Sequence, residues 1–190
     1  DVDAMFADFV PAQVTCLPQY TDLLPGVAEV TQRLQKAGIK IGATTGFTRS
    51  MVDVLLEAAR KQGFNPDATV AGDEVIHGAR PNPHMVYKNL DLLGIHTIQS
   101  VVKVDDTVSG VGEALNAGCW GIGVSRYSNY MDMDTPDADK AMSTEEIAYR
   151  HEHSKDLLRR AGAHYVLDSI ADIEPVIEDI NARLARGEKP

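Results

Sequence analysis

The stretch IKIGATTGFTR, residues 39–49, holds the pattern that decides the fold. A short apolar, β-branched run leads into Thr44, Thr45 and Gly46, and a helical pattern starts directly after them. Where a strand turns straight into a helix, hydroxyl groups and free backbone N–H groups meet at the positive end of the helix dipole. Such a place suits a phosphate group, although Thr44 and Thr45 could equally be no more than caps of the helix.

Strand and helix patterns alternate along most of the chain. Strands are predicted at 39–43, 68–71, 100–104, 119–124 and 164–167. Helices are predicted at 1–17, 25–38, 50–62, 83–93, 108–117, 144–160 and 169–186. This order is typical of βαβ units and predicts an α/β fold, a Rossmann-like parallel sheet with helices on both faces.

The composition limits the kinds of partner. With 190 residues, of which 44% are hydrophobic, the chain can form one domain with a substantial core. A formal net charge of −10 argues against nucleic acid and against an anionic membrane surface as partners. No apolar run approaches the roughly 18 residues of a membrane span. We expect Cys16 and Cys119 to be reduced and buried in a cytoplasmic protein.

Polar residues follow three of the predicted strands. They are Thr44–Gly46, Arg80 in the loop after the second strand, and Asp105 with Asp106 after the third. Ligands of open α/β sheets bind at these carboxyl ends. Two adjacent carboxylates repel one another unless a cation lies beside them, and hard oxygen ligands favour Mg²⁺. Simpler interpretations stay open, namely a solvated acidic loop that caps the next helix and a surface arginine in a salt bridge.

Longer phrases of the sequence carry a family resemblance. They are LPGVAEVTQRLQKAGIKIGATTGFTRSMVD, GARPNPHMVYKNL, VVKVDDTVSGVGEALNAGCWGIGV and AGAHYVLDSI. Together they resemble the haloacid dehalogenase-like phosphotransferases and, within these, the phosphonoacetaldehyde hydrolases, or phosphonatases. The resemblance implies a Mg²⁺-dependent hydrolase of this fold. It would cleave the carbon–phosphorus bond of phosphonoacetaldehyde to acetaldehyde and phosphate, a step in the degradation of 2-aminoethylphosphonate.

The resemblance also implies a role for each strand-end residue. Thr45 and Gly46 would hold the phosphoryl group of a small phosphonate or phosphorylated substrate. Arg80 would neutralise the charge of that group, so Thr45 and Arg80 are the predicted catalytic residues. Asp106, together with Asp105, would hold Mg²⁺.

Two positions depart from the usual family pattern. The family often has glycine before the first aspartate of the metal motif and a second aspartate four residues after it. Here these positions are Asp105 and Gly110. We interpret this as a double-aspartate variant in which Asp105 replaces the later ligand. Phe47 stands where the family often has tyrosine, so the ring is kept and the hydroxyl is lost.

The beginning of the chain departs further. The family has an N-terminal strand that ends in Asp-x-x-Gly-Thr, with the nucleophilic aspartate, and an inserted helical cap with the Schiff-base lysine. Neither matches a part of this sequence. Residues 1–20 resemble the last cap helix and its linker, and residues 21–190 resemble the core domain. Lys88 and Lys103 are predicted to be structural. We therefore expect no turnover by this chain alone, unpaired strand edges beside Thr45, and, by resemblance, a homodimer.

Two other functions compete with this one. The first is a phosphomonoester hydrolase of the same superfamily, similar to phosphoglycolate phosphatase. Such an enzyme needs no lysine and would resist borohydride trapping with the aldehyde substrate. The second is a truncated, non-catalytic remnant that binds magnesium and phosphate without turnover.

Overall fold

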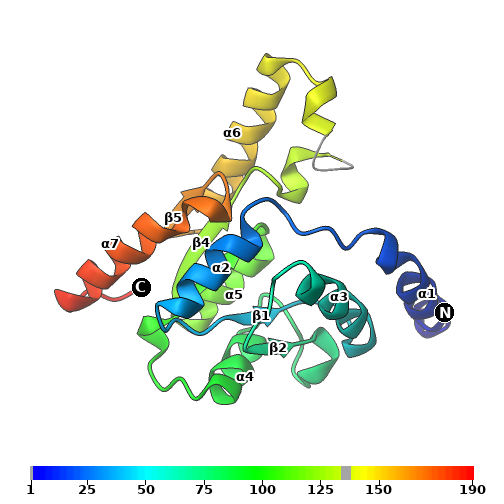
Figure 1. Ribbon diagram of the computed structural model, residues 1–190, viewed down its shortest axis with the longest axis horizontal. Helices are drawn as coiled ribbons and strands as arrows, with labels where there is room; N and C mark the ends of the chain where they lie inside the picture. Colours follow the sequence, from blue (N-terminus) through cyan, green and yellow to red (C-terminus); the bar gives the residue numbers. More distant parts are fainter. Residues whose placement is uncertain (1, 134–137) are drawn as a thin grey trace.

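The computed structural model describes residues 2–133 and 138–190 (Figure 1). Its strands are β1 (Gly42–Thr44), β2 (Ala68–Val70), β3 (Val102–Asp105), β4 (Trp120–Val124) and β5 (Tyr165–Leu167). Its α-helices are α1 (Val2–Cys16), α2 (Val27–Lys36), α3 (Arg49–Lys61), α4 (His84–Leu93), α5 (Val108–Ala117), α6 (Thr144–Arg160) and α7 (Ile173–Ala185). Short 3-10 helices are η1 (Leu17–Gln19), η2 (Gly72–Glu74), η3 (Ile98–Ser100), η4 (Asn129–Met131), η5 (Ala138–Ala141) and η6 (Ile170–Asp172). The alternation confirms the predicted α/β class.

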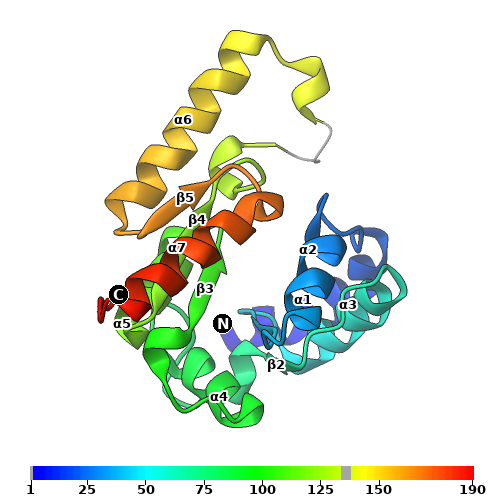
Figure 2. The same cartoon turned by 60° about the vertical axis from the view of Figure 1, so that its left-hand side comes forward.

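The strands form two separate parallel sheets rather than one continuous sheet. β1 pairs with β2, while β3, β4 and β5 pair in that order. Among the described residues no strand pairing joins β1 to β3, so each of these strands has a partner on one side only. Figure 2 shows the two parts side by side, with α3 next to β2 and with α7 over β3 and β4. An unpaired edge on β1 is what the resemblance implies.

β1 begins three residues later than predicted. Gly38 has a φ of 86°, and the N–H of Ile39 donates to the carbonyl of Leu34 at 3.0 Å. This is a left-handed ending of α2, which only glycine adopts without strain. Because Ile39 still belongs to that ending, extended pairing starts only at Gly42.

β4 shows how one strand separates two layers. Trp120 and Ile122 are two residues apart and therefore share a face, where α2 and α7 cover them. Gly121 and Gly123 lie on the opposite face. There a Cβ on Gly123 would be only 3.0 Å from the Cβ of Leu158 in α6. The alternation of large and minimal side chains lets helices pack on both faces.

Separate apolar groups hold the other helices in place. α4 and α5 pack together through Val86, Ala114 and Ala117. α3 packs beside the two-stranded sheet through Val52 and Leu56, together with Ala71 after β2. These contacts fix the carboxyl ends of β1 and β3, where the predicted functional residues lie.

The two cysteines have different environments. Cys119 is fully buried, and burial raises the pKa of its thiol to about 11, so it is an inert core residue. Cys16 is exposed at the end of α1, so the prediction of a buried thiol is wrong for this residue. Its neighbour Leu17 occupies the buried position instead.

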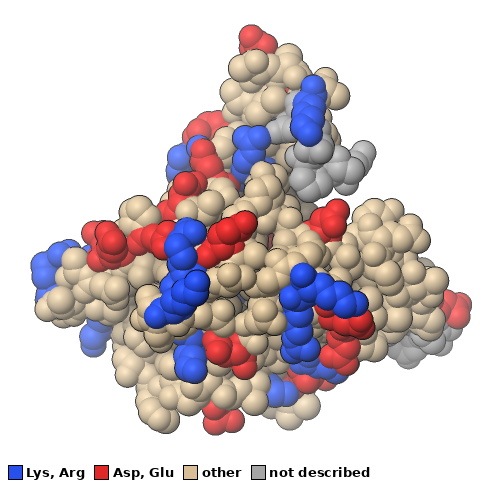
Figure 3. Space-filling model, in the orientation of Figure 1, with Lys and Arg blue, Asp and Glu red and all other residues tan. Residues whose placement is uncertain are grey.

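The surface carries both signs of charge. On the face drawn in Figure 3, acidic and basic side chains lie next to one another. Ion pairs such as Arg33 with Glu174, at 2.7 Å, connect some of them. In the described part of the chain, every helix is too short or too polar to span a membrane.

Candidate active site

The guanidinium of Arg80 brings the predicted strand-end residues together. Its Nη2 donates to the carbonyl oxygen of Thr44 at 2.8 Å and lies 3.2 Å from the Thr44 hydroxyl. Its Nη1 lies 3.1 Å from Oδ2 of Asp105, and its Nε lies 3.3 Å from Oε2 of Glu113 in α5. Arg80 comes from the loop between β2 and α4 and therefore bridges the two sheets. The simpler interpretation, a surface arginine in a salt bridge, is right about the salt bridge and wrong about the surface, because only 20% of the Arg80 side chain is exposed.

Asp105 is buried among donors at the end of β3. Its Oδ2 accepts a hydrogen bond from Nζ of Lys103 at 2.6 Å, and its Oδ1 accepts from the N–H and the hydroxyl of Thr107 at 3.1 and 2.8 Å. Burial alone would raise the pKa of this carboxyl, but the charges of Lys103 and Arg80 and these hydrogen bonds bring the pKa below its usual value. Asp105 is therefore held as a carboxylate with both oxygens already in contact with donors.

Asp106 has the opposite environment. Burial and the neighbouring charge of Asp105 raise the pKa of the Asp106 carboxyl. Within the described residues no cationic side chain forms an ion pair with it, whereas Asp105 has two such partners. A divalent cation beside Asp106 would relieve this repulsion, and Mg²⁺ commonly binds one or two carboxylates together with phosphate oxygens and water. The donor set therefore fits Mg²⁺, although the described residues contain no cluster of three metal-binding side chains.

The Asp105 carboxylate fills the space that a side chain at position 110 would need. A Cβ built on Gly110 would lie 1.9 Å from Cγ of Asp105. With the present backbone, the Asp105 side chain and a side chain at position 110 therefore cannot both be accommodated. This contact gives a physical basis for a variant in which an acid at position 105 accompanies glycine at position 110.

The loop after β1 differs from both predictions made for it, a set of free N–H groups at the helix start and a helix cap at Thr44 and Thr45. The N-cap of α3 is Thr48, so the alternative that Thr44 and Thr45 cap this helix is wrong. The Thr45 hydroxyl accepts a hydrogen bond from the N–H of Phe47 at 3.2 Å and can still donate to a ligand. The first helical N–H, that of Arg49, donates to the Asp73 carboxylate at 2.9 Å. The helix end thus offers fewer free N–H groups to an anion than predicted.

Gly46 lies in close contact with the segment that follows β2. A Cβ on Gly72 would be 2.7 Å from the carbonyl oxygen of Gly46, and the N–H of Gly72 donates to the carbonyl of Phe47 at 2.8 Å. Only glycine at position 72 allows this approach. The contact holds the Thr45–Phe47 turn at the end of β1.

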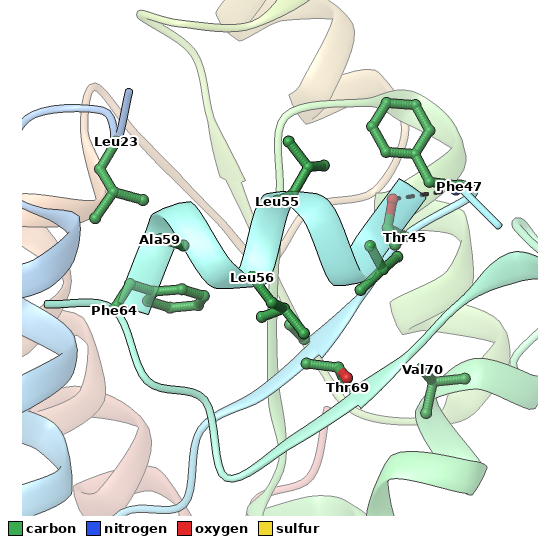
Figure 4. Close-up of a pocket in the computed structure, with 11 residues that line it drawn as sticks. Leu23, Thr45, Phe47, Leu55, Leu56, Ala59, Phe64, Thr69 and Val70 are labelled. Carbon is green, nitrogen blue, oxygen red and sulfur yellow. Dashed lines mark hydrogen bonds between the residues drawn. The ribbon is translucent and has the colours of Figure 1, made fainter. Parts of the chain in front are cut away.

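A cavity of about 210 Å³ opens on the other side of Thr45. Figure 4 shows that Leu55 and Leu56 of α3 line it together with Phe64 and Val70. Such an apolar lining offers no compensation for a phosphate charge. The candidate anion site is therefore the polar side of the strand ends, where Arg80 and the two aspartates lie.

The sequence predictions give no functional role to two charged residues of this site. Lys103 is predicted to be structural, and no prediction concerns Glu113. A signal exists for Lys103, because residues 103 and 105 are two apart in a strand and share a face. Lys88, the other lysine predicted to be structural, donates to the carbonyl of Glu74 at 3.1 Å.

The fold and these strand-end residues define the class of the haloacid dehalogenase-like hydrolases, whose family model matches residues 3–118. Phosphonoacetaldehyde hydrolases from Paraburkholderia phytofirmans and Salmonella typhi are each 43% identical over all 190 residues, which cover 70% of either relative. The chain belongs to this family of phosphonoacetaldehyde hydrolases. A crystal structure of a phosphonoacetaldehyde hydrolase-like protein from Oleispira antarctica matches with a TM-score of 0.95 and 41% identity, over 100% of this chain and 68% of the other.

Proposed function

We propose that this chain supplies the phosphate- and magnesium-binding residues for hydrolysis of phosphonoacetaldehyde to acetaldehyde and phosphate. The observation that supports the proposal is that Arg80 contacts both Thr44 at the end of β1 and Asp105, the neighbour of Asp106, at the end of β3. The identity of 43% over all 190 residues to relatives with this name, of which the chain covers 70%, supports the choice of substrate.

Each residue has a distinct task in the proposed reaction. The Thr45 hydroxyl and the Gly46 backbone contact the phosphoryl oxygens, and the Arg80 guanidinium stabilises the negative charge that they carry during transfer. Asp106 is the direct ligand of Mg²⁺, which when bound would neutralise further charge on the phosphoryl group. Asp105 stays a predicted second ligand, and both of its oxygens already contact donors, Oδ2 those of Lys103 and Arg80 and Oδ1 those of Thr107.

The proposed reaction needs two further groups. One is a nucleophilic aspartate that attacks phosphorus, and the other is a lysine that forms an imine with the aldehyde so that the carbon–phosphorus bond can break. The 190 residues contain no Asp-x-x-Gly-Thr stretch. We therefore propose that this chain binds Mg²⁺ and phosphate but does not release acetaldehyde by itself.

Two measurements test the proposal. Calorimetric titration of the chain with inorganic phosphate in the presence of Mg²⁺ should show binding that Arg80→Gln abolishes, while Arg33→Gln, in an exposed ion pair, should leave it unchanged. Incubation with phosphonoacetaldehyde and Mg²⁺ should release no acetaldehyde. Absence of phosphate binding, or equal binding by the Arg80 variant, would refute the assigned site. Acetaldehyde release that Asp106→Ala abolishes would show that the chain is a complete enzyme.

A further inference from the structure

Glu113 is a fully buried acid with no hydrogen bond in the described structure. Its side chain is 0% exposed, and neither carboxylate oxygen has a hydrogen-bond partner. Two cations lie nearby, with Nε of Arg80 at 3.3 Å and Nζ of Lys103 at 3.4 Å. The Nε of Arg80 also has no hydrogen-bond partner. These buried polar atoms need an explanation beyond packing.

The position of Glu113 in α5 makes its burial costly. Gly110 and Ala117, three residues before it and four residues after it on the same face of the helix, are also buried, so this face is otherwise apolar. A carboxylate in such a place is strongly destabilising unless cations compensate its charge. Arg80 and Lys103 supply that compensation, and each of them also contacts Asp105. Two cations and two anions therefore alternate in one buried cluster.

The contacts of Arg80 explain what Glu113 can do in this cluster. A guanidinium is planar, so a contact at Nε determines where the two terminal nitrogens point. Glu113 lies on the Nε side, toward α5, while Nη1 and Nη2 face Asp105 and Thr44 at the strand ends. We infer that Glu113 is a positioning residue, which aligns Arg80 so that its terminal N–H groups face the phosphoryl site. The consequence for phosphate rests on the proposed function, whereas the alignment itself does not.

Removal of the Glu113 charge has two opposing effects on an anion. If Glu113 only balances charge, Glu113→Gln leaves the cluster more positive, and phosphate should bind more tightly. If Glu113 aligns Arg80, the same variant frees the guanidinium to rotate, and phosphate should bind more weakly. The sign of the change therefore separates positioning from charge balance.

The alignment can be observed directly by NMR of the arginine Nε–H groups in the ¹⁵N-labelled chain. The Arg80 cross-peak is assigned by its loss in Arg80→Lys. In Glu113→Gln we expect it to move toward the position of exposed arginines and to exchange faster with solvent. The Nε–H of Arg33, which pairs with Glu174 on the surface, serves as the internal reference. An Arg80 cross-peak that stays at its original position would overturn the inference.

A double variant provides a second test in case Glu113→Gln alone does not fold. Lys103→Gln with Glu113→Gln removes one charge of each sign, so that Arg80 and Asp105 still balance. We expect the Arg80 cross-peak to move in this variant as well. Lys103→Gln alone should leave it in place, because Glu113 remains. A shift caused by Lys103→Gln alone, with none from the Glu113 change, would contradict the assignment.

Phosphate titration in the presence of Mg²⁺ gives the functional readout. In Glu113→Gln we expect the affinity to fall about tenfold, because the guanidinium loses the ion-pair contact at Nε that aligns it. Glu174→Gln, far from the site on α7, should have no effect. Equal or tighter binding in Glu113→Gln would overturn the positioning role. If the unmodified chain binds no phosphate, the proposed function fails, while the NMR comparison still decides the role of Glu113.

Discussion

Two clusters of polar side chains lie at the carboxyl ends of the strands, one at β1 and β3 and the other at β4 and β5. In the second cluster, Ser125 follows β4 and Asp168 follows β5, and His151 of α6 lies between them. The Ser125 hydroxyl is 2.8 Å from Nε2 of His151, and Oδ1 of Asp168 is 3.4 Å from the same nitrogen. Nζ of Lys155 lies 2.7 Å from Asp168.

The second cluster contains the residue types of a catalytic triad but not its geometry. In a triad the acid and the hydroxyl contact different nitrogens of the imidazole, whereas here both approach Nε2. Ser125 is 0% exposed, and its hydroxyl donates to the carbonyl of Leu167 at 3.0 Å, so it must accept from the histidine. In the described structure, the Ser125 hydroxyl therefore uses both its donor and its acceptor capacity on groups of the protein itself.

The first cluster differs because several of its buried polar atoms have no hydrogen-bond partner. Nε of Arg80 and both carboxylate oxygens of Glu113 lack hydrogen bonds in the described structure, and the charge of Asp106 is opposed by its surroundings. A position at a strand end is therefore not sufficient to define a site. Unbalanced charge and unused hydrogen-bonding capacity distinguish the two clusters, and variants can test each side of this contrast.

The largest effect is expected from loss of Arg80. Arg80→Gln leaves Asp105 and Glu113 buried with Lys103 as their one remaining cation within the described contacts. Loss of one partner from a buried ion pair typically costs about 3–5 kcal/mol of unfolding free energy. Urea unfolding measures this change. Arg33→Gln breaks an exposed pair, which solvent screens, and should therefore change the unfolding free energy much less. Equal stability of the two variants would show that the contacts of Arg80 in the first cluster contribute no more to the unfolding free energy than a surface ion pair does.

A smaller effect is expected from filling the space beside Asp105. The added Cβ of Gly110→Ala would overlap the Asp105 carboxylate, and overpacking of this kind costs about 1–3 kcal/mol. In combination with Asp105→Gly the overlap disappears. Urea unfolding of the four proteins in the double-mutant cycle should therefore show a favourable coupling of about 0.5–3 kcal/mol. Strictly additive effects would mean that the backbone moves to relieve the contact.

The exchanged pair, Asp105→Gly with Gly110→Asp, extends the same cycle to metal binding. It restores the spacing that the family often has, with the second acid four residues after Asp106. We expect stabilisation by Mg²⁺ to persist in this double variant and to be lost in Asp106→Asn. Thermal unfolding with and without Mg²⁺ gives the comparison. If Mg²⁺ no longer stabilised the exchanged pair, an acid at position 110 could not replace Asp105 as the second Mg²⁺ ligand.

The next effect concerns the unbalanced charge of Asp106. Its pKa is raised in the folded state, so the carboxyl favours its neutral form, and stability falls as pH rises through that folded pKa. At pH 7 without metal, Asp106→Asn should therefore be more stable than the unmodified chain, with the difference vanishing in acid. Mg²⁺ should reverse the order, since only the carboxylate binds it. Urea midpoints of both proteins at several pH values measure this difference. A less stable Asp106→Asn at pH 7 without metal would contradict the prediction.

The strand order and the contacts of Arg80 can be predicted from the sequence, whereas the start of β1 cannot. The alternating pattern is sufficient for the strand order along the chain and for the meeting of Arg80 with the β1 end and Asp105, because parallel strands share a carboxyl edge. It fails at β1, where the left-handed turn at Gly38 delays the strand. The glycine marks the end of the helix in the sequence, but the residue at which β1 first pairs with β2 depends on contacts between the two strands.

The positioning residue could not be predicted in the same way. Glu113 is one acid in a helix, and helical acids are usually solvated. Only the approach of α5 to Arg80 and Lys103 makes it a buried partner, and that approach depends on long-range packing. Likewise, the exclusion of a side chain at position 110 by Asp105 is visible in three dimensions and not from spacing.

The smallest effect is expected in the second cluster. Burial lowers the pKa of His151, and the charge of Asp168 opposes this shift only in part. Because the unfolded chain binds the proton more readily, the contribution of His151 to stability is present at neutral pH and is lost as pH falls through its folded pKa. His151→Asn keeps a donor for Ser125 and should flatten the fall in unfolding free energy between about pH 7 and pH 5.

His153, exposed on the same helix, provides the matched control for this measurement. His153→Asn should keep the pH dependence of the unmodified chain, because the partly buried His151 remains. Phosphate binding should be unchanged in both variants, since none of the described contacts of the second cluster involves Arg80. If His151→Asn instead weakened phosphate binding as strongly as the Glu113 variant, the two clusters would be energetically coupled, and strand ends on both sides of β4 would have to be treated as one site.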